Sequence, residues 1–402
     1  MLRVFDQGGS LLDMINEESK EICPLIAARQ ILVQSKMGEG SFGRVFSIVV
    51  GNDRTSYVLK DVEMYDQHQP YIRIAADSAR NAIEIASLRS RVPLEIIEKA
   101  NANLKGDVFN VYDVGVPMII AETLVDEDEV IPKNDRSGAI VLRKGDHRAN
   151  EIQTEALISL IVGRMVRTGE SMFLVDTFAI ASCEAEKRDR YHTFFFMEKV
   201  DGVLKERIRI GHGDEGDANG RAVILQLLMA VAALHKRGIQ HNDLHVGNVF
   251  YKIRPKDDAE TFRYVCETSS GPRETFSVAT PFIVKVGDFG LSLKVTHPRI
   301  QNSLLEQSDW NAVPNYWLPG FDVLQLLYSF RLQGVKTAKL MLIALLGSKE
   351  LVSSVMFDDA GRTHKKYWTK PSLKTLTMTK VWDAWFTSTK IVQPVGRIIT
   401  VQ

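Results

Sequence analysis

One short polar segment, residues 241–248, restricts the folds open to this chain more than any other. It reads His-Asn-Asp-Leu-His-Val-Gly-Asn and follows a long apolar helix expected over 222–235. Asp243 can accept or orient the proton of an acceptor hydroxyl, and Asn248 can bind a magnesium ion that also touches phosphates. A carboxylate and a carboxamide on one loop form a suitable oxygen-ligand set for a hard cation. The alternative is a turn that is merely rich in Asn, Asp and Gly.

A second acidic turn follows at 284–291, Val-Lys-Val-Gly-Asp-Phe-Gly-Leu. Asp288 comes directly after a strand-like run, where its carboxylate could hold magnesium that bridges the β- and γ-phosphates of a nucleotide. An Asp-x-Gly sequence after a strand is a common turn. The prediction therefore depends on the position of Asp288 downstream of the Asp243 loop.

A glycine cluster, Gly-Glu-Gly-Ser-Phe-Gly-Arg-Val at 38–45, lies near the start of the chain. Glycines let a hairpin backbone approach phosphate oxygens without interference from side chains. The dinucleotide-binding motif begins in the same way but requires a helix after its third glycine. Here a β-rich run follows, which favours a phosphate-binding hairpin, with an ordinary glycine turn as the alternative.

Lys60 ends the next strand-like run and is predicted to hold the α- and β-phosphates of a nucleotide. Lys144 also follows a strand-like run and competes for this role, but Lys60 lies at the better distance from the glycine cluster. Such a lysine needs a carboxylate partner that keeps it charged and aimed. Glu155, in the middle of a predicted helix, is preferred to Glu151 one turn earlier and to Glu84 in another helix.

The hydrophobic pattern predicts an α+β protein in which a sheet-rich part precedes a helix-rich part, with a cleft between two lobes. Residues 61–150 are interpreted as an insertion that contains helices at 75–88 and 94–100 and a strand at 139–142. A second insertion is expected between Ile253 and Pro281. The other expected strands are 31–33, 45–50, 57–59, 173–175, 193–197, 249–253 and 282–286, and the other helices are 151–166, 322–330, 337–346 and 380–386.

Composition excludes several classes of protein. Lys plus Arg number 50 and Asp plus Glu number 50, so the net charge is zero, and no whole-chain electrostatic attraction to nucleic acid or to an anionic membrane is expected. The three cysteines, Cys23, Cys183 and Cys266, form neither a disulfide framework nor a metal-binding spacing, which favours an intracellular location. No signal peptide is recognised in residues 1–10, and no apolar run in the C-terminal half is long enough to cross a bilayer.

Taken in order, these motifs resemble those of the eukaryotic-type protein kinase superfamily over residues 38–290. The resemblance implies a two-lobed α+β fold with an N-terminal extension (1–30), a β-rich N-lobe (31–199, with the insertion at about 61–150) and a helical C-lobe (200–402). It implies an enzyme that uses ATP and Mg²⁺ to phosphorylate Ser/Thr hydroxyls of protein substrates. The implied sets are catalytic Asp243, Lys60 and Glu155; ATP-binding Gly38, Gly40, Gly43, Val45, Lys60, Glu198 and Val200; and metal-binding Asn248 and Asp288.

Two further segments extend the resemblance. Residues 197–200, Met-Glu-Lys-Val, are similar to the hinge that receives adenine through backbone hydrogen bonds, with Met197 in the gatekeeper position. Residues 321–327 are similar to the central C-lobe helix, so Asp322 is expected to brace the catalytic loop. Neither nucleic acid nor membrane is expected as a partner.

The sequence departs from the family pattern at several positions. Asn242 stands where many of these kinases have an arginine that pairs with a phosphorylated activation segment, so we expect activity without phosphorylation in residues 291–320.

His245 stands where many of these kinases have lysine. The resulting Asp-Leu-His-x-Gly-Asn motif is similar to that of haspin, of aminoglycoside phosphotransferases and of kinases of large double-stranded DNA viruses. No Ala-Pro-Glu motif closes the activation segment; 316–320 lies near its place. A viral kinase of the host cytoplasm or virion is expected, with a small-molecule kinase and a pseudokinase scaffold as alternatives.

Overall fold

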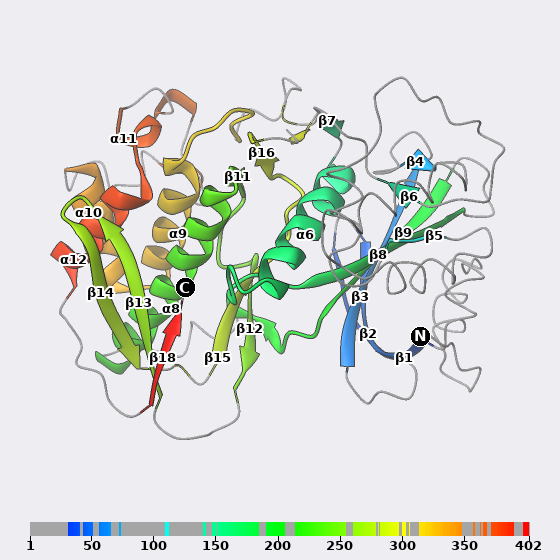
Figure 1. Cartoon of the computed structure of the whole chain (residues 1–402), viewed down its shortest axis with the longest axis horizontal. Helices are drawn as coiled ribbons and strands as arrows, with labels where there is room; N and C mark the ends of the chain where they lie inside the picture. The colour runs from blue at the N-terminus through cyan, green and yellow to red at the C-terminus, as the bar shows by residue number, and fades with distance from the viewer. Residues whose placement is uncertain are drawn as a thin grey trace, which may run out of the picture. The chain divides into compact units, whose positions relative to one another are not determined.

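The computed structural model divides the chain into two compact units (Figure 1). Unit 1 comprises Met1–Arg167, Val175–Lys199 and His297–Gln301, and unit 2 comprises Thr168–Leu174, Val200–Thr296 and Asn302–Gln402. The structure describes residues 31–40, 43–50, 56–65, 72–73, 109–111, 140–141, 147–149, 151–184, 190–205, 214–254, 260–278, 280, 282–296, 300–302, 305, 313–347, 357, 362, 365–367, 371–389 and 397–401.

Unit 1 is built on a six-stranded antiparallel sheet. The first three strands form consecutive hairpins, as the sequence predicts, and their β-branched and aromatic residues favour strand formation. Three consecutive phenylalanines, 194–196, are all buried, so the central strand β9 is covered on both faces. The sheet order is β1 (Ile31–Gly40), β2 (Gly43–Val50), β3 (Ser56–Tyr65), β9 (Arg190–Glu198), β8 (Thr177–Glu184) and β5 (Phe109–Val111).

Helix α6 (Glu151–Arg167) packs against strand β8 of this sheet. Its buried residues Ile158, Ile161, Val162 and Met165 recur at helical spacing and form the face of the helix directed at the core. The predicted helix at 151–166 is confirmed. Three shorter strands complete the described part of this half: β4 (Ile72–Arg73), which pairs with β6 (Ile140–Val141), and β7 (His147–Ala149).

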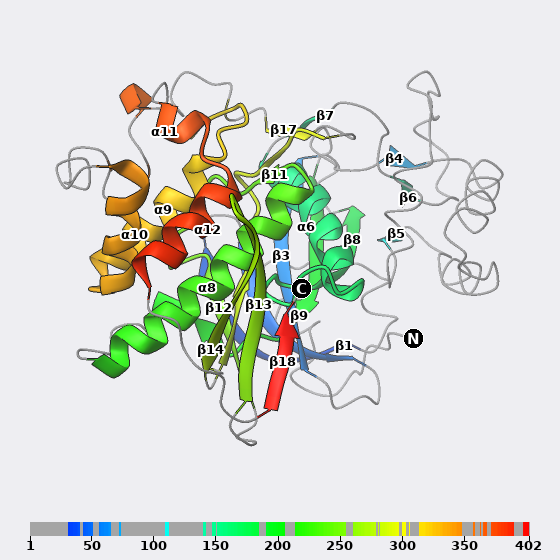
Figure 2. The ribbon, with the colours of Figure 1, turned by 60° about the vertical axis from the view of Figure 1, so that its left-hand side comes forward.

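Unit 2 surrounds a central helix, α9, whose residues 320–330 are all buried. The helices predicted at 222–235, 322–330, 337–346 and 380–386 are confirmed, each longer than expected, and the first begins eight residues earlier, at Asp214. Figure 2 shows these helices together with the adjoining strands. The helices are α8 (Asp214–Lys236), α9 (Gly320–Leu332), α10 (Lys336–Leu346), α11 (Pro371–Lys374) and α12 (Met378–Ser388), with a 3₁₀ turn, η3 (Lys365–Tyr367).

Two pairs of short strands bring the predicted polar loops of unit 2 together. Strand β12 pairs with β15, and β11 pairs with β16, both antiparallel. Residues 241–248 connect β11 to β12, and residues 287–292 connect β15 to β16, so the two loops are forced to lie side by side. The bounds are β10 (Gly202–Val203), β11 (Ile239–Gln240), β12 (Val249–Ile253), β15 (Phe282–Val286), β16 (Leu293–Lys294) and β17 (Ile300–Asn302).

The C-terminal half is less purely helical than the sequence predicts. The segment interpreted as an insertion between Ile253 and Pro281 folds into a hairpin, and the last strand joins it in parallel. Helix α12 packs on this sheet through Trp385, whose ring nitrogen donates to the Thr275 hydroxyl at 3.3 Å. The sheet order is β14 (Gly271–Val278), β13 (Glu260–Thr268) and β18 (Arg397–Val401).

Other sequence predictions require correction or fall outside the described residues. The strand expected at 173–175 is only an isolated bridge from Leu174 to Val286, and the true strand β8 starts at Thr177. Strand β3 continues to Tyr65, so residue 61 belongs to the sheet and not to an insertion. The extension 1–30 and the helices expected at 75–88 and 94–100 lie outside the described residues. The chain is an α+β protein with antiparallel sheets.

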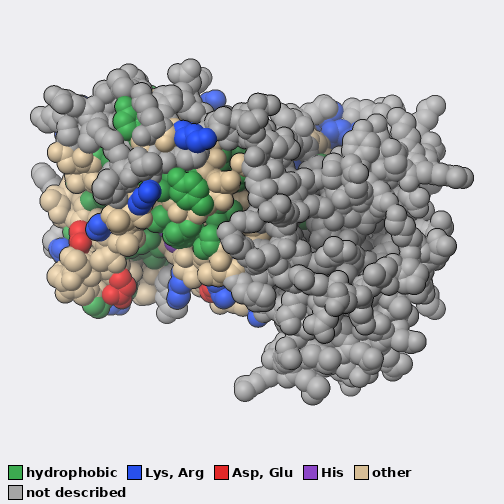
Figure 3. All heavy atoms as spheres, turned by 90° about the horizontal axis from the view of Figure 1, so that it is seen from above, with side chains coloured by type: hydrophobic (Ala, Val, Ile, Leu, Met, Phe, Trp, Pro, Cys, Tyr) green, Lys and Arg blue, Asp and Glu red, His purple; other side chains and the backbone are tan. Residues whose placement is uncertain are grey.

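The surface charges and the helices of the described residues agree with the composition. Positive, negative and apolar side chains are interspersed on the face drawn in Figure 3. Among the described helices, none is both long enough and apolar enough to span a bilayer.

The glycine hairpin generates a first testable prediction. Gly43 has φ +137°, and a Cβ atom there would lie 2.2 Å from the backbone oxygen of Asp61. Gly43→Ala therefore combines backbone strain with a steric clash that neither backbone can relieve without moving. We expect a loss of about 2–4 kcal/mol in the free energy of unfolding, measured by urea denaturation.

Gly169→Ala is the matched control. Gly169 also has a positive φ of +77°, but nothing lies within 4 Å of a Cβ placed there. This variant measures the backbone strain alone, about 1 kcal/mol. Equal losses for the two variants would contradict the close approach of Gly43 to β3.

Candidate active site

The loops 241–248 and 287–292 are joined by hydrogen bonds. The backbone N–H of Gly287 donates to the carbonyl of Asn248 at 3.2 Å, and the ring Nε2 of His241 lies 3.0 Å from the carbonyl oxygen of Gly287. Phe289 is buried, and its ring packs against that of His241 at 5.1 Å between centroids. Asp288 is exposed, with φ +64°, a conformation that the buried residue after it holds in place.

The structure brings the two predicted functional residues of the first loop together. The side-chain amide nitrogen of Asn248 donates to the backbone oxygen of Asp243 at 2.9 Å and to its Oδ2 at 3.1 Å. Because the amide nitrogen faces Asp243, the amide oxygen of Asn248 is directed away from that carboxylate. This orientation suits a cation ligand.

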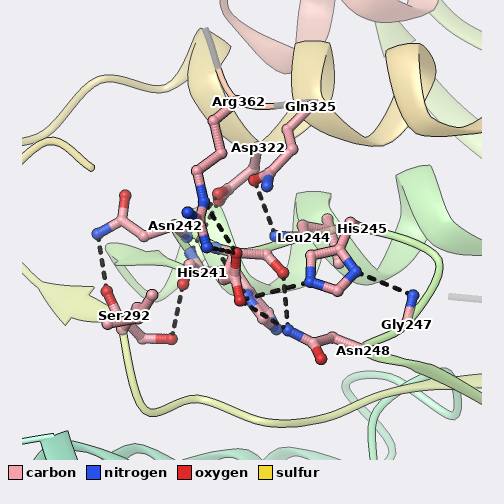
Figure 4. A network of polar contacts seen from close by, with 12 residues as sticks. His241, Asn242, Leu244, His245, Gly247, Asn248, Ser292, Asp322, Gln325 and Arg362 are labelled. Atoms are coloured by element: carbon pink, nitrogen blue, oxygen red, sulfur yellow. Dashed lines mark hydrogen bonds and ion pairs between the residues drawn. The ribbon is translucent and has the colours of Figure 1, made fainter. Parts of the chain in front are cut away.

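Asp322 of α9 braces the loop, as the sequence predicts (Figure 4). Its carboxylate is fully buried and accepts the backbone N–H groups of His241 at 2.9 Å and Asn242 at 2.8 Å. His235, at the end of α8, lies 3.3 Å from the same carboxylate. Burial acts to raise the pKa of Asp322, but the contacts with His235 and His241 outweigh it and hold the pKa below its usual value.

Two buried glutamines complete this support. Gln325, one turn after Asp322 on α9, accepts the backbone N–H of Leu244 at 2.9 Å. Gln240 accepts the N–H of Leu318 at 2.6 Å and donates to the side-chain oxygen of Asn242. The loop backbone is therefore held at His241, Asn242 and Leu244 by buried side chains of α9, which makes its shape a consequence of the core.

Asn242, at the position expected to carry arginine, is fully buried and adopts a left-handed conformation with φ +69°. Asparagine tolerates this region better than most residues. Its amide nitrogen donates to the carbonyls of Leu291 at 3.0 Å and Pro314 at 3.3 Å. One neutral side chain thereby connects both ends of the segment 291–314 to the loop.

His245 is turned into its own loop. Its Nδ1 accepts the backbone N–H of Gly247 at 3.0 Å, while Nε2 lies 3.5 Å from Oδ2 of Asp243. A Cβ atom on Gly247 would lie 2.7 Å from the imidazole, so the ring is packed against the glycine backbone. The imidazole therefore packs within its own loop and lies beside the carboxylate of Asp243.

Sequence reasoning missed Arg362. Its guanidinium donates to Oδ1 of Asp243 through Nη2 at 2.7 Å and through Nε at 3.2 Å (Figure 4). Burial acts to raise the pKa of Asp243, but the neighbouring side chains of His245 and Arg362 outweigh it and hold the pKa well below its usual range. The arginine lies 119 positions after Asp243 in no recognisable motif, so the sequence carries no signal for it.

In unit 1 the structure brings Lys60 and Glu155 together. Lys60 Nζ lies 2.5 Å and 2.7 Å from the two carboxylate oxygens of Glu155, with side chains 13% and 6% exposed. This low exposure places the ion pair in an environment where water screens it little. The competing residues Lys144 and Glu84 lie outside the described residues, as does the side chain of Glu151.

The remaining predicted nucleotide-binding residues belong to unit 1, apart from Val200. Gly38 and Gly40 lie in β1, Gly43 begins β2, and Val45 pairs with Lys60 across β2 and β3. The hairpin is further held by an ion pair between Arg44 and Asp61 at 2.6 Å.

The predicted hinge residues are partly buried. The backbone N–H of Glu198 donates to the carbonyl of Asp176 at 2.9 Å, and its side chain accepts the N–H of Asp176 at 3.0 Å. Val200 follows two residues later and is half-buried. The structure fixes Glu198 through Asp176, and the adenine contacts implied for Glu198 and Val200 stay predictions.

The donor set is compatible with magnesium. Among the described residues no group of three or more His, Cys, Asp or Glu side chains could hold a metal ion. Magnesium is often bound by one or two carboxylates together with the phosphates of the substrate. Asn248 and Asp288, on hydrogen-bonded loops, fit a site of that incomplete kind.

Comparison with known proteins finds similarity over only part of the chain. No family model matches the chain. Over 83 residues the chain is 37% identical to "Probable serine/threonine-protein kinase 380R" of Invertebrate iridescent virus 6. The match covers 20% of this chain and 15% of that protein, so the chain spans only a small part of the relative. The similarity indicates a kinase-like relationship.

The brace under the loop gives a second prediction. Asp322→Asn should lower the free energy of unfolding by about 2–3 kcal/mol near neutral pH, because charge-assisted hydrogen bonds to a buried group are lost. The folded-state pKa of Asp322 is depressed, so its stabilisation is present above the unfolded value of about 4 and is lost as the pH falls below it. The difference between wild type and variant should therefore shrink on acidification.

Urea denaturation at several pH values measures this difference. Asp383→Asn is the control, because Asp383 also accepts a backbone N–H, that of Ser269 at 3.1 Å, but at an exposed contact. We expect it to cost less than about 1 kcal/mol. A deficit for Asp322→Asn that does not change with pH would contradict the role of the charge.

Proposed function

We propose that the chain is a protein kinase that transfers the γ-phosphate of ATP to Ser/Thr hydroxyls of protein substrates. The observation that carries this proposal is the Asp243–Asn248 pair, held on one loop by the buried Asp322 and hydrogen-bonded to the loop of Asp288. Aspartates and an asparagine in this order suit metal-assisted phosphoryl transfer. The partial similarity to a viral serine/threonine-protein kinase supports the same reaction.

Each predicted residue has a role in this proposal. The glycine hairpin and Lys60, aimed by Glu155, would bind the phosphates of ATP. Asn248 and Asp288 would hold Mg²⁺, which neutralises the charge that develops on the transferred group. Asp243 would orient the acceptor hydroxyl and accept its proton. A two-lobed kinase fold and action inside an infected host cell, in its cytoplasm or in the virion, belong to the same proposal.

Asp243→Ala tests the central residue. We expect it to reduce phosphorylation of casein or myelin basic protein by about 10³-fold or more, because the group that positions the acceptor is lost. Binding of magnesium–ATP, measured by calorimetry, should change little, because Asp243 is not among the predicted nucleotide contacts. A variant that stays active would overturn the assignment of the catalytic loop.

Lys60→Met tests the phosphate-binding residue. It should remove most of the activity and also weaken ATP binding, since the ion pair with Glu155 is lost. Lys339→Met, on the exposed side of α10, is the control and should retain full activity. If Lys144→Met abolishes activity and Lys60→Met does not, the strand assignment must change.

One observation keeps a second function open. The sheet β14-β13-β18 is an addition to unit 2 of the kind that a small-molecule kinase would use to hold its acceptor. Phosphorylation of an aminoglycoside but not of casein would favour that function. Magnesium-dependent ATP binding without any turnover would instead indicate a scaffold.

The contacts of Asn242 predict how the activity is regulated. Its amide already connects Leu291 and Pro314 to the loop, so no phosphate is needed to order this connection. Dephosphorylated protein, verified by mass spectrometry, should keep its full specific activity. Asn242→Ala should lower activity under the same conditions. Activity that appears only after phosphorylation within residues 291–320 would contradict this prediction.

A further inference from the structure

We propose that Arg362 is a positioning residue for Asp243 and supplies the fixed cation that the loop itself lacks. This inference rests on the proposed function. It assigns to a residue far downstream the task of orienting the carboxylate that faces the acceptor hydroxyl.

The contact is specific in its geometry. Two donors of one guanidinium, Nη2 and Nε, converge on a single oxygen of Asp243, Oδ1. The other oxygen, Oδ2, accepts the amide of Asn248 at 3.1 Å. The carboxylate plane is therefore fixed from both sides, by Arg362 at Oδ1 and by Asn248 at Oδ2.

His245 cannot take over this task. Its Nδ1 is occupied by the N–H of Gly247, and its Nε2 stands 3.5 Å from Oδ2, beyond ordinary hydrogen-bond length. The longer contact of His245 lies on Oδ2, and the shorter contacts of Arg362 lie on the opposite oxygen, Oδ1.

Phe357, five positions before Arg362, contacts the helix that braces the loop. Phe357 is buried and stacks on Tyr328 of α9, with ring centroids 4.0 Å apart and planes at 15°. Gln325 and Asp322, which hold the loop backbone, lie on that helix about one and two turns before Tyr328. Helix α9 therefore contacts both Phe357 and the loop that carries Asp243.

The Arg362–Asp243 ion pair is partly buried, so its loss should affect the orientation of Asp243. The side chains of Arg362 and Asp243 are 21% and 17% exposed, so neither charge is fully solvated. An Asp243 carboxylate without Arg362 would keep its charge but lose the donors that set its orientation. Misplacement of a reacting group by about 1 Å can reduce a rate by about 10²-fold.

The test uses single and double variants of the full chain in the casein or myelin basic protein assay. Arg362→Ala should lower kcat by about 10- to 100-fold, with the KM for ATP and the melting temperature nearly unchanged. Arg362→Lys should recover part of the loss. In the Arg362→Ala background, His245→Lys should restore kcat by about 10-fold, because a lysine on the loop supplies the missing cation. Arg273→Ala, an exposed arginine of β14, is the control for loss of charge.

Three outcomes would overturn the inference. Unchanged activity of Arg362→Ala would show that the contact does not contribute to catalysis. Increased activity would show that the contact is inhibitory. A matching loss of melting temperature and kcat, without rescue by His245→Lys, would make it merely structural. The proposed function fails separately: in that case Asp243→Ala would be as active as wild type, whatever Arg362 does.

Discussion

The candidate site depends on one buried charge, the carboxylate of Asp322. A buried ionised group is tolerated only when hydrogen bonds replace its lost hydration. Here two backbone N–H groups of the loop and His235 at the end of α8 supply them, so the carboxylate of α9 connects all three elements. Because the buried charge of Asp322 must be paired, it fixes the geometry of the loop that carries Asp243.

Three neutral side-chain amides connect this loop and the segments around it through further hydrogen bonds. Gln325 fixes the backbone at Leu244, Gln240 fixes the N–H of Leu318, and Asn242 connects the loop to Leu291 and Pro314. Each is buried and satisfies backbone groups that would otherwise lack partners. An arginine in place of Asn242 would bring a charge that needs an anion nearby. The amide needs none, which explains how the segment 291–314 can be connected without added phosphate.

Local patterns could be predicted from the sequence, whereas distant pairings could not. Strands β1 to β3 and helix α6 follow from periodicity, and their positions place Lys60 next to Glu155. The run 173–175 is apolar but too short to distinguish a strand from a bridge, so the true strand β8 was missed. The hairpin β13–β14 carried a usable signal, since Phe262, Tyr264 and Cys266 alternate before a Ser-Ser-Gly-Pro turn. Arg362 carried none, because only the packed fold brings it to Asp243.

The two departures within the loop are explained by contacts outside it. Asn242 replaces an expected arginine and bonds to backbone groups at both ends of the next segment. His245 replaces an expected lysine, turns into the loop, and leaves a cation to come from Arg362. The residues suited to phosphoryl transfer are thus local and readable from the sequence. Asn242 replaces the missing arginine from within the loop, whereas the cation that replaces the missing lysine, Arg362, comes from far along the chain. The loss of both cations from the motif therefore does not imply loss of the chemistry.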